Sequence, residues 1–220
     1  MKISVQEAAE FLATDGERVT RWIENDDLPA QRIRGQYRIN RTDLLEWATA
    51  RGVAVAPRAF RLDDDAPSLA DALRAGGVHR EVSGTDVHSV IASIVAELPI
   101  ADENDRELLR HVLHARESLG VTPVGDGIAI PHARTPIILA PAGAVMALSF
   151  LTSPLDLGAP DGRPVDTFFL LLCPTVHVHL AMLARLAYGL RDSAFHAAVR
   201  ERASAEEIVA LAAALEGAFR

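Results

Sequence analysis

The residues with the clearest chemical potential lie in one short segment, Gly125-Asp-Gly-Ile-Ala-Ile-Pro-His-Ala-Arg134. The apolar residues 128–130 indicate a brief buried strand, and Pro131 should end it because proline has no backbone N–H to donate to a ladder. We therefore expect His132 to stand at the edge of a sheet on a stiff support. A histidine held in this way can be a core residue, a metal ligand, a general base or a nucleophile, and the segment alone leaves all four possibilities open.

A second pair of histidines, His177 and His179, follows Pro174 and Thr175 at the predicted start of a helix. Free backbone N–H groups and the helix dipole favour an anion at such a place. Together with His132 the pair could suggest zinc. However, residues two apart diverge on a helix, and no second cysteine or nearby acidic ligand completes the set. We therefore expect neither a metal nor a cofactor.

The composition is that of an ordinary soluble globular protein, with 220 residues of which 49% are hydrophobic and 24% charged. The formal net charge of −8 argues against binding nucleic acid or anionic membrane through bulk charge, so any DNA contact must come from a local patch. Cys173 lies in an apolar run and is interpreted as a small buried hydrophobic residue. The chain has neither a secretory signal nor the roughly 20 apolar residues of a membrane helix. We expect a cytoplasmic protein without membrane insertion.

The first fifty residues predict a helix, a tight turn and a second helix. Ser4 and Glu7 have the spacing of a capping box at the start of the first helix, and Thr14-Asp-Gly16 predicts the turn. Apolar residues alternate with arginines around Gly35 in residues 31–41, which predicts a small hairpin, and a closing helix should span residues 43–50. Helix, turn and helix in this order is an arrangement that reads DNA.

Residues 3–52 resemble the excisionase-like, MerR-related helix-turn-helix domains through Leu28-Pro29, the arginine-bearing segment 32–38 and Arg41-Thr-Asp-Leu44. The resemblance implies a winged domain that contacts DNA. Side chains of a recognition helix would approach base edges, and those of the wing would grip phosphate; the candidates are Arg18, Thr20 and Arg21 in the helix and Arg32, Arg34 and Arg38 in the wing. A homodimer would be needed, because one small module seldom holds a site alone.

The charge of this segment leaves a second interpretation open. Residues 1–52 contain eight basic and nine acidic residues, and acidic side chains repel phosphate. The segment is therefore either a DNA-binding module or a module that docks on protein or has lost its binding function.

Two domains are predicted, residues 1–54 and 67–220, because residues 55–66 show no periodicity and read as a linker. In the second domain, helices alternate with strands near residues 76–82, 128–130, 144–151 and 167–172. One helix, residues 103–118, should turn Leu108, Leu109, Val112 and Leu113 inward. The pattern predicts an α/β sandwich with a central, mostly buried mixed sheet flanked by helices.

Residues 67–218 resemble the enzyme IIA domains of the bacterial phosphoenolpyruvate-dependent phosphotransferase system, in the mannitol/fructose and nitrogen-regulatory class. The segment 125–134 carries the resemblance, together with residues 113–120 before it and 161–174 after it. In that family the histidine after Ile-Pro accepts the phosphoryl group, which implies this role for His132. His179 and Arg116 match a second histidine and an arginine of the family, which implies that they stabilise the phosphate. The resemblance also implies a histidine phosphocarrier protein as donor, and a permease subunit or a regulatory target protein as a further partner.

These patterns together predict a two-domain regulator in which phosphorylation of His132 alters DNA binding by the N-terminal domain, since an added charge near a domain interface can change docking. Two alternatives stay open. One is a non-catalytic transcription factor whose second domain senses a partner or a small anion. The other is a phosphoryl relay component of sugar transport, although a helix-turn-helix domain has no use in a simple relay.

Overall fold

The structure is a computed structural model that describes residues 2–26, 28–33, 35–51, 53, 55, 67–117, 123–132 and 143–219. Arg34 and most of the predicted linker, residues 55–66, lie outside these ranges. Among the described helices, none combines the length and the apolar character needed to cross a membrane.

The N-terminal part begins with the predicted helix, turn and helix, preceded by a short strand. Ser4 caps the first helix in a capping box: its hydroxyl oxygen accepts from the Glu7 N–H at 3.2 Å, and the Glu7 carboxylate accepts from the Ser4 N–H at 2.7 Å. Asp15 caps the second helix. The elements are β1 (Lys2–Ile3), α1 (Val5–Phe11) and α2 (Gly16–Asn25).

The predicted hairpin is present as β2 (Ala30–Ile33) and β3 (Gln36–Asn40), which pair antiparallel with Arg32 opposite Tyr37. Strand β1, which no sequence pattern indicated, pairs antiparallel with the other side of β3. The closing helix α3 (Arg41–Ala50) begins directly after β3. It therefore starts at Arg41 rather than at Asp43.

The C-terminal part contains the predicted helices and strands and one strand, β5, that the sequence did not indicate. In chain order these elements are α4 (Leu69–Gly76), β4 (Val78–Val82), α5 (Val87–Glu97), α6 (Glu103–Glu117), β5 (Pro123–Gly125), β6 (Ile128–Ala129), β7 (Val145–Leu155), β8 (Val165–Leu172), α7 (Val176–Gly189), α8 (Ser193–Arg200), α9 (Ala205–Leu215) and the 3-10 helix η2 (Glu216–Phe219). The helix expected from His179 begins earlier, at Val176, because Thr175 caps it.

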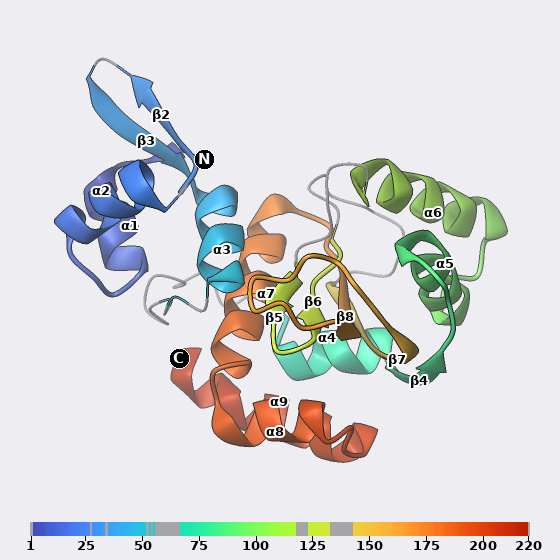
Figure 1. The fold of residues 1–220 in the computed structure, drawn as a ribbon. Helices are drawn as coiled ribbons and strands as arrows, with labels where there is room; N and C mark the ends of the chain where they lie inside the picture. Colours follow the sequence, from blue (N-terminus) through green and yellow to red (C-terminus); the bar gives the residue numbers. More distant parts are fainter. Residues whose placement is uncertain are drawn as a thin grey trace.

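The sheet of the C-terminal part is mixed and has five strands in the order β4-β7-β8-β6-β5. Strands β4 and β7 are parallel, as are β6 and β8, whereas β7 with β8 and β5 with β6 are antiparallel. Alternating residues of β7 enter two separate cores, with Phe150 on one face of the sheet and Leu151 on the other. The core on the Phe150 side includes α4, α7, α8 and α9, and the other core includes α5 and α6, so helices flank both faces (Figure 1).

The prediction of buried residues in α6 is wrong at one position. Leu109 and Leu113 are buried, but Leu108 is 54% exposed. Consecutive helical residues point about 100° apart, so a helix packed along a narrow stripe cannot bury both Leu108 and Leu109. Helix α6 packs mainly against α5, which supplies only such a stripe.

Helix α3 joins the two parts of the molecule. It contacts α7 and β5, and its buried residues Leu44, Leu45 and Ala48 belong to the same apolar core as α7 (Figure 1). The N-terminal part therefore packs directly on the face of the sheet that α7 covers.

Candidate functional site

His132 lies just beyond the end of β6, beside the C-terminal half of β8. Pro131 cannot donate a hydrogen bond, but its carbonyl oxygen accepts from the Leu171 N–H at 3.0 Å, and His132 forms an isolated parallel bridge with Leu171. Because β6 lies between β8 and β5, His132 stands at the end of an inner strand and not at the edge of the sheet as predicted. The prediction failed because β5 has only three residues, Pro-Val-Gly, which are too few to show a strand pattern.

The imidazole of His132 is fixed by a backbone carbonyl. Its Nδ1 lies 2.8 Å from the carbonyl oxygen of Ile130. A carbonyl oxygen only accepts, so Nδ1 carries a proton, and in the neutral form of the ring the lone pair is on Nε2. The residue is buried, with 3% of its surface exposed.

The structure brings His179 next to His132. The two ring centroids are 5.0 Å apart with an angle of 38° between the ring planes, and His179 is 5% exposed. His179 lies in the first turns of α7, where its backbone N–H donates to the Thr175 carbonyl at 3.0 Å. His177, which the sequence paired with it, is exposed. The His-x-His spacing therefore does not form a common site.

The start of α7 follows directly from the strand that flanks His132. Strand β8 ends at Leu172, and Thr175 caps α7 by accepting from the Val178 N–H at 3.1 Å. The preceding N–H groups of the first turn have no partner within a helix and carry the positive end of its dipole. The arrangement places a helix N-terminus, a buried imidazole and a second imidazole at the same end of the parallel pair β6 and β8, which suits a tetrahedral anion.

The other predicted site residue of the C-terminal part is Arg116. It lies in the last turn of α6, but its side chain is outside the described parts of the structure. Among the described residues, no three histidine, cysteine, aspartate or glutamate side chains come together as a metal site requires. Cys173 is buried at 6% exposure, and burial raises the pKa of its thiol to about 12, so it is not a nucleophile at neutral pH.

The predicted DNA-contacting residues lie on α2 and on the hairpin. The Arg18 guanidinium lies 5.4 Å from the centre of the Trp22 ring, and Arg21 is exposed on the same helix. Thr20 is half-buried, and its hydroxyl donates to the Gly16 carbonyl at 2.9 Å, so it is directed into its own helix.

On the hairpin, the Arg32 guanidinium lies 5.8 Å from the centre of the Tyr37 ring, and Arg38 Nη2 donates to Gln36 Oε1 at 3.2 Å. The hairpin projects away from the C-terminal part, whereas α3 lies between that part and helices α1 and α2 (Figure 1). Its arginines are thus separate from the histidine pair.

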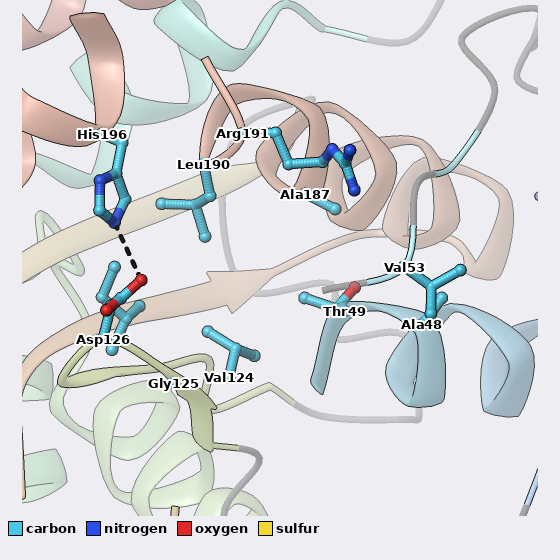
Figure 2. A pocket seen from close by; sticks show the side chains of 11 residues that line it. Ala48, Thr49, Val53, Val124, Gly125, Asp126, Ala187, Leu190, Arg191 and His196 are labelled. Carbon is cyan, nitrogen blue, oxygen red and sulfur yellow. Dashed lines mark ion pairs between the residues drawn. The ribbon is translucent and has the colours of Figure 1, made fainter. Parts of the chain in front are cut away.

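Sequence reasoning missed a charged cluster at the turn before β6. The Asp126 carboxylate lies 3.6 Å from His196 Nε2 (Figure 2). It also accepts from Arg163 Nη1 at 2.8 Å, and the Asp126 N–H donates to Asp161 Oδ2 at 2.7 Å. Backbone N–H groups of Asp126 and Arg163 hold the pKa of Asp161 below its usual value. Because the four residues come from distant segments, no local pattern indicated the cluster.

Comparisons with known proteins find a family match in each part of the chain. Residues 72–214 match the family described as phosphoenolpyruvate-dependent sugar phosphotransferase system, EIIA 2, and residues 3–52 match a family described as helix-turn-helix domain. A nitrogen regulatory protein of Pseudomonas aeruginosa is 40% identical over 121 residues, which are 54% of this chain and 75% of that protein. One of Bradyrhizobium diazoefficiens is 38% identical over 125 residues, which are 56% of this chain and 78% of that protein.

A solved structure is also similar. The crystal structure of nitrogen regulatory protein IIA-Ntr from Neisseria meningitidis superimposes with a TM-score of 0.50 and 27% sequence identity, covering 63% of this chain and 93% of that one. The mixed sheet flanked by helices is thus a fold that this relative shares.

Proposed function

Because the chain belongs to the EIIA type 2 family of the phosphoenolpyruvate-dependent sugar phosphotransferase system, we propose that its C-terminal part carries a phosphoryl group on Nε2 of His132. The observation that supports this most directly is the hydrogen bond from His132 Nδ1 to the Ile130 carbonyl. In the neutral ring this bond leaves the lone pair on Nε2, which is the atom that attacks phosphorus.

The donor is a histidine phosphocarrier protein. The Nε2 lone pair of His132 forms the new N–P bond while the N–P bond of the donor breaks and its imidazole leaves. The phosphorylated ring gains positive character, and the Ile130 carbonyl stabilises it at Nδ1–H. His179 and the first N–H groups of α7 face the charge that develops on the phosphoryl oxygens, and Arg116 is the proposed clamp for two of them. Since His132 is 3% exposed, neighbouring atoms must move when the donor docks.

The N-terminal domain, residues 1–54, binds DNA in this proposal, and the linker 55–66 connects it to the EIIA-like domain, residues 67–220. The match to a helix-turn-helix family supports this function. Arg18 and Arg21 of α2 approach base edges, and the hairpin β2–β3 acts as a wing whose arginines grip phosphate. Thr20 does not take part through its hydroxyl, which donates to Gly16. A homodimer supplies the second half-site.

The regulatory role is favoured over a sugar-transport relay. Relatives with 40% and 38% identity are named nitrogen regulatory proteins, and a relay has no use for a DNA-binding domain. The phosphorylation state of His132 therefore controls what the N-terminal domain binds. The deep burial of His132 favours a second candidate, a non-catalytic transcription factor whose second domain only senses a partner or a small anion.

Phosphorylation tests the first candidate against the second. The protein is incubated with phosphoenolpyruvate, the general phosphotransferase enzyme and a histidine phosphocarrier protein. We expect an acid-labile phosphate that is lost in His132→Ala and kept in His177→Ala, a control at an exposed histidine in the first turn of α7. Wild-type protein that stays unlabelled would reject the carrier function.

DNA binding is tested separately. In Arg21→Ala combined with Arg32→Ala, we expect weaker retention of a promoter-proximal DNA fragment. The slope of its salt dependence should be smaller by roughly 1, for the lost phosphate contact of Arg32. Arg74→Ala, at an exposed arginine of α4, is the control and should leave retention unchanged. If wild type retains no such fragment, the N-terminal part is a docking module instead.

A further inference from the structure

Helix α3 contacts the two elements that hold the histidine pair. It packs on β5, which is hydrogen-bonded to β6, and β6 leads directly to His132. It also packs on α7, which carries His179 in its first turns. The N-terminal part therefore rests on both supports of the candidate site at once (Figure 1).

A pocket of about 370 Å³ opens to solvent beside the contact between α3 and the C-terminal part. It is lined by Ala48, Thr49 and Val53 on one side and by Val124, Ala187 and Leu190 on the other (Figure 2). On this side the C-terminal part does not pack tightly against α3, so a shift of α3 breaks few dispersion contacts there.

Each support can transmit a displacement to the histidines. In the β5–β6 hairpin, Pro123 pairs with Ala129 and Gly125 pairs with Ile128. The next residue is Ile130, whose carbonyl oxygen accepts the hydrogen bond from Nδ1 of His132. Helix α7 is continuous from His179 to Ala187, a rise of about 12 Å at 1.5 Å per residue. A shift of α3 therefore reaches both rings through rigid elements.

The turn that joins β5 and β6 is anchored on its other side. Asp126 is held by Arg163 at 2.8 Å and by Asp161 through its backbone N–H at 2.7 Å. These bonds connect the turn to residues 161–163, so the β5–β6 hairpin is held at its turn as well as by α3.

From these contacts we infer that α3 is a positioning element for the His132–His179 pair, acting through the β5–β6 hairpin and α7. The coupling is reciprocal: if the packing of α3 affects the histidine pair, a change at the histidine pair affects the packing of α3 by the same free energy. Given the proposed function, on which this second part rests, phosphorylation of His132 changes the packing of α3 and so reaches the DNA-binding elements. No contact between DNA and the EIIA-like part is required.

The positioning role is tested without any phosphoryl donor. Nuclear magnetic resonance spectra of histidine-labelled full-length protein report the ring signals of His132 and His179, assigned with His132→Asn and His179→Asn. Ala48→Glu places a carboxylate at a fully buried position of α3 in the contact. We expect it to shift both ring signals. Gln6→Glu, which adds the same group to an exposed position of α1, should leave them unchanged.

A second variant covers the case in which Ala48→Glu disrupts the N-terminal fold, which circular dichroism would reveal. Thr49→Glu alters a half-buried residue that lines the same pocket, and a smaller shift in both signals is expected. Ring signals that are identical to wild type in a folded α3 variant would overturn the inference.

The rate of phosphorylation provides an independent measurement. If α3 positions the pair, the folded α3 variants should accept phosphate between roughly tenfold and a hundredfold more slowly, as expected for displaced reacting groups. Gln6→Glu should match wild type. Wild type that accepts no phosphate would reject the proposed function, and the ring signals would still decide whether α3 positions the histidines.

Discussion

Replacing Gly127 with alanine should destabilise the C-terminal part and the hairpin that leads to His132. Gly127 has φ +72°, a conformation that L-residues rarely adopt. An added Cβ would lie 2.9 Å from Arg200 Nη1, 3.2 Å from Asp166 Oδ1 and 3.3 Å from the Pro164 carbonyl oxygen. The substitution therefore combines backbone strain with a steric conflict.

The magnitude follows from these two effects. The left-handed backbone costs an alanine about 1–2 kcal/mol. The backbone cannot move away, because the Gly127 carbonyl accepts from the N–H groups of Asp166 and Thr167 at 2.9 and 3.1 Å. Arg200 must move instead, which disturbs its 3.0 Å ion pair with Asp166 and adds roughly 0.2–1 kcal/mol. The sum, about 1.2–3 kcal/mol, lowers the folding equilibrium constant roughly 8- to 150-fold.

Gly162→Ala is a control that separates the backbone strain from the steric conflict. Gly162 has φ +70°, and an added Cβ would meet no atom within 4 Å, so only the strain of about 1–2 kcal/mol applies. Urea unfolding is followed by circular dichroism for the whole chain. Fluorescence of the two tryptophans, Trp22 and Trp47, reports the N-terminal part separately. The reasoning is refuted if Gly127→Ala costs no more than Gly162→Ala.

Two further predictions concern residues near the histidine pair. Burial raises the pKa of Cys173 from 9.0 to about 12. Its contribution to stability is therefore complete below pH 9 and is lost as pH rises toward 12, at about 1.4 kcal/mol per pH unit. The free energy of unfolding in urea should show this slope above pH 9 in wild type and lose it in Cys173→Ala. Thr175→Ala removes the cap of α7, so it should cost about 1 kcal/mol of stability and slow the phosphorylation of His132. Ser204→Ala removes the matching cap of α9 and should cost as much stability without slowing phosphorylation. Equal phosphorylation rates in the two variants would contradict the role of the α7 N-terminus.

Local patterns in the chain were sufficient to predict most elements. The capping box at Ser4 and Glu7 and the periodic apolar stripe of α5 depend on neighbours within one or two turns, so they are readable without a fold. Segment 125–134 identified His132 as the candidate nucleophile, although its role there rested on resemblance. The prediction failed for the burial of Leu108 and for the presence of β5. Both depend on which other element of the fold packs against the segment.

Tertiary structure alone decided how the candidate site is assembled. His132 and His179 meet because β6 and β8 are parallel neighbours and α7 begins directly after β8, an order that no spacing in the chain expresses. The same holds for the cluster around Asp126 and for the contact of α3 with β5 and α7. Hydrogen bonds and apolar contacts within a helix or hairpin are specified by adjacent residues, whereas the pairing of distant strands depends on the burial of the whole sheet, to which every element contributes.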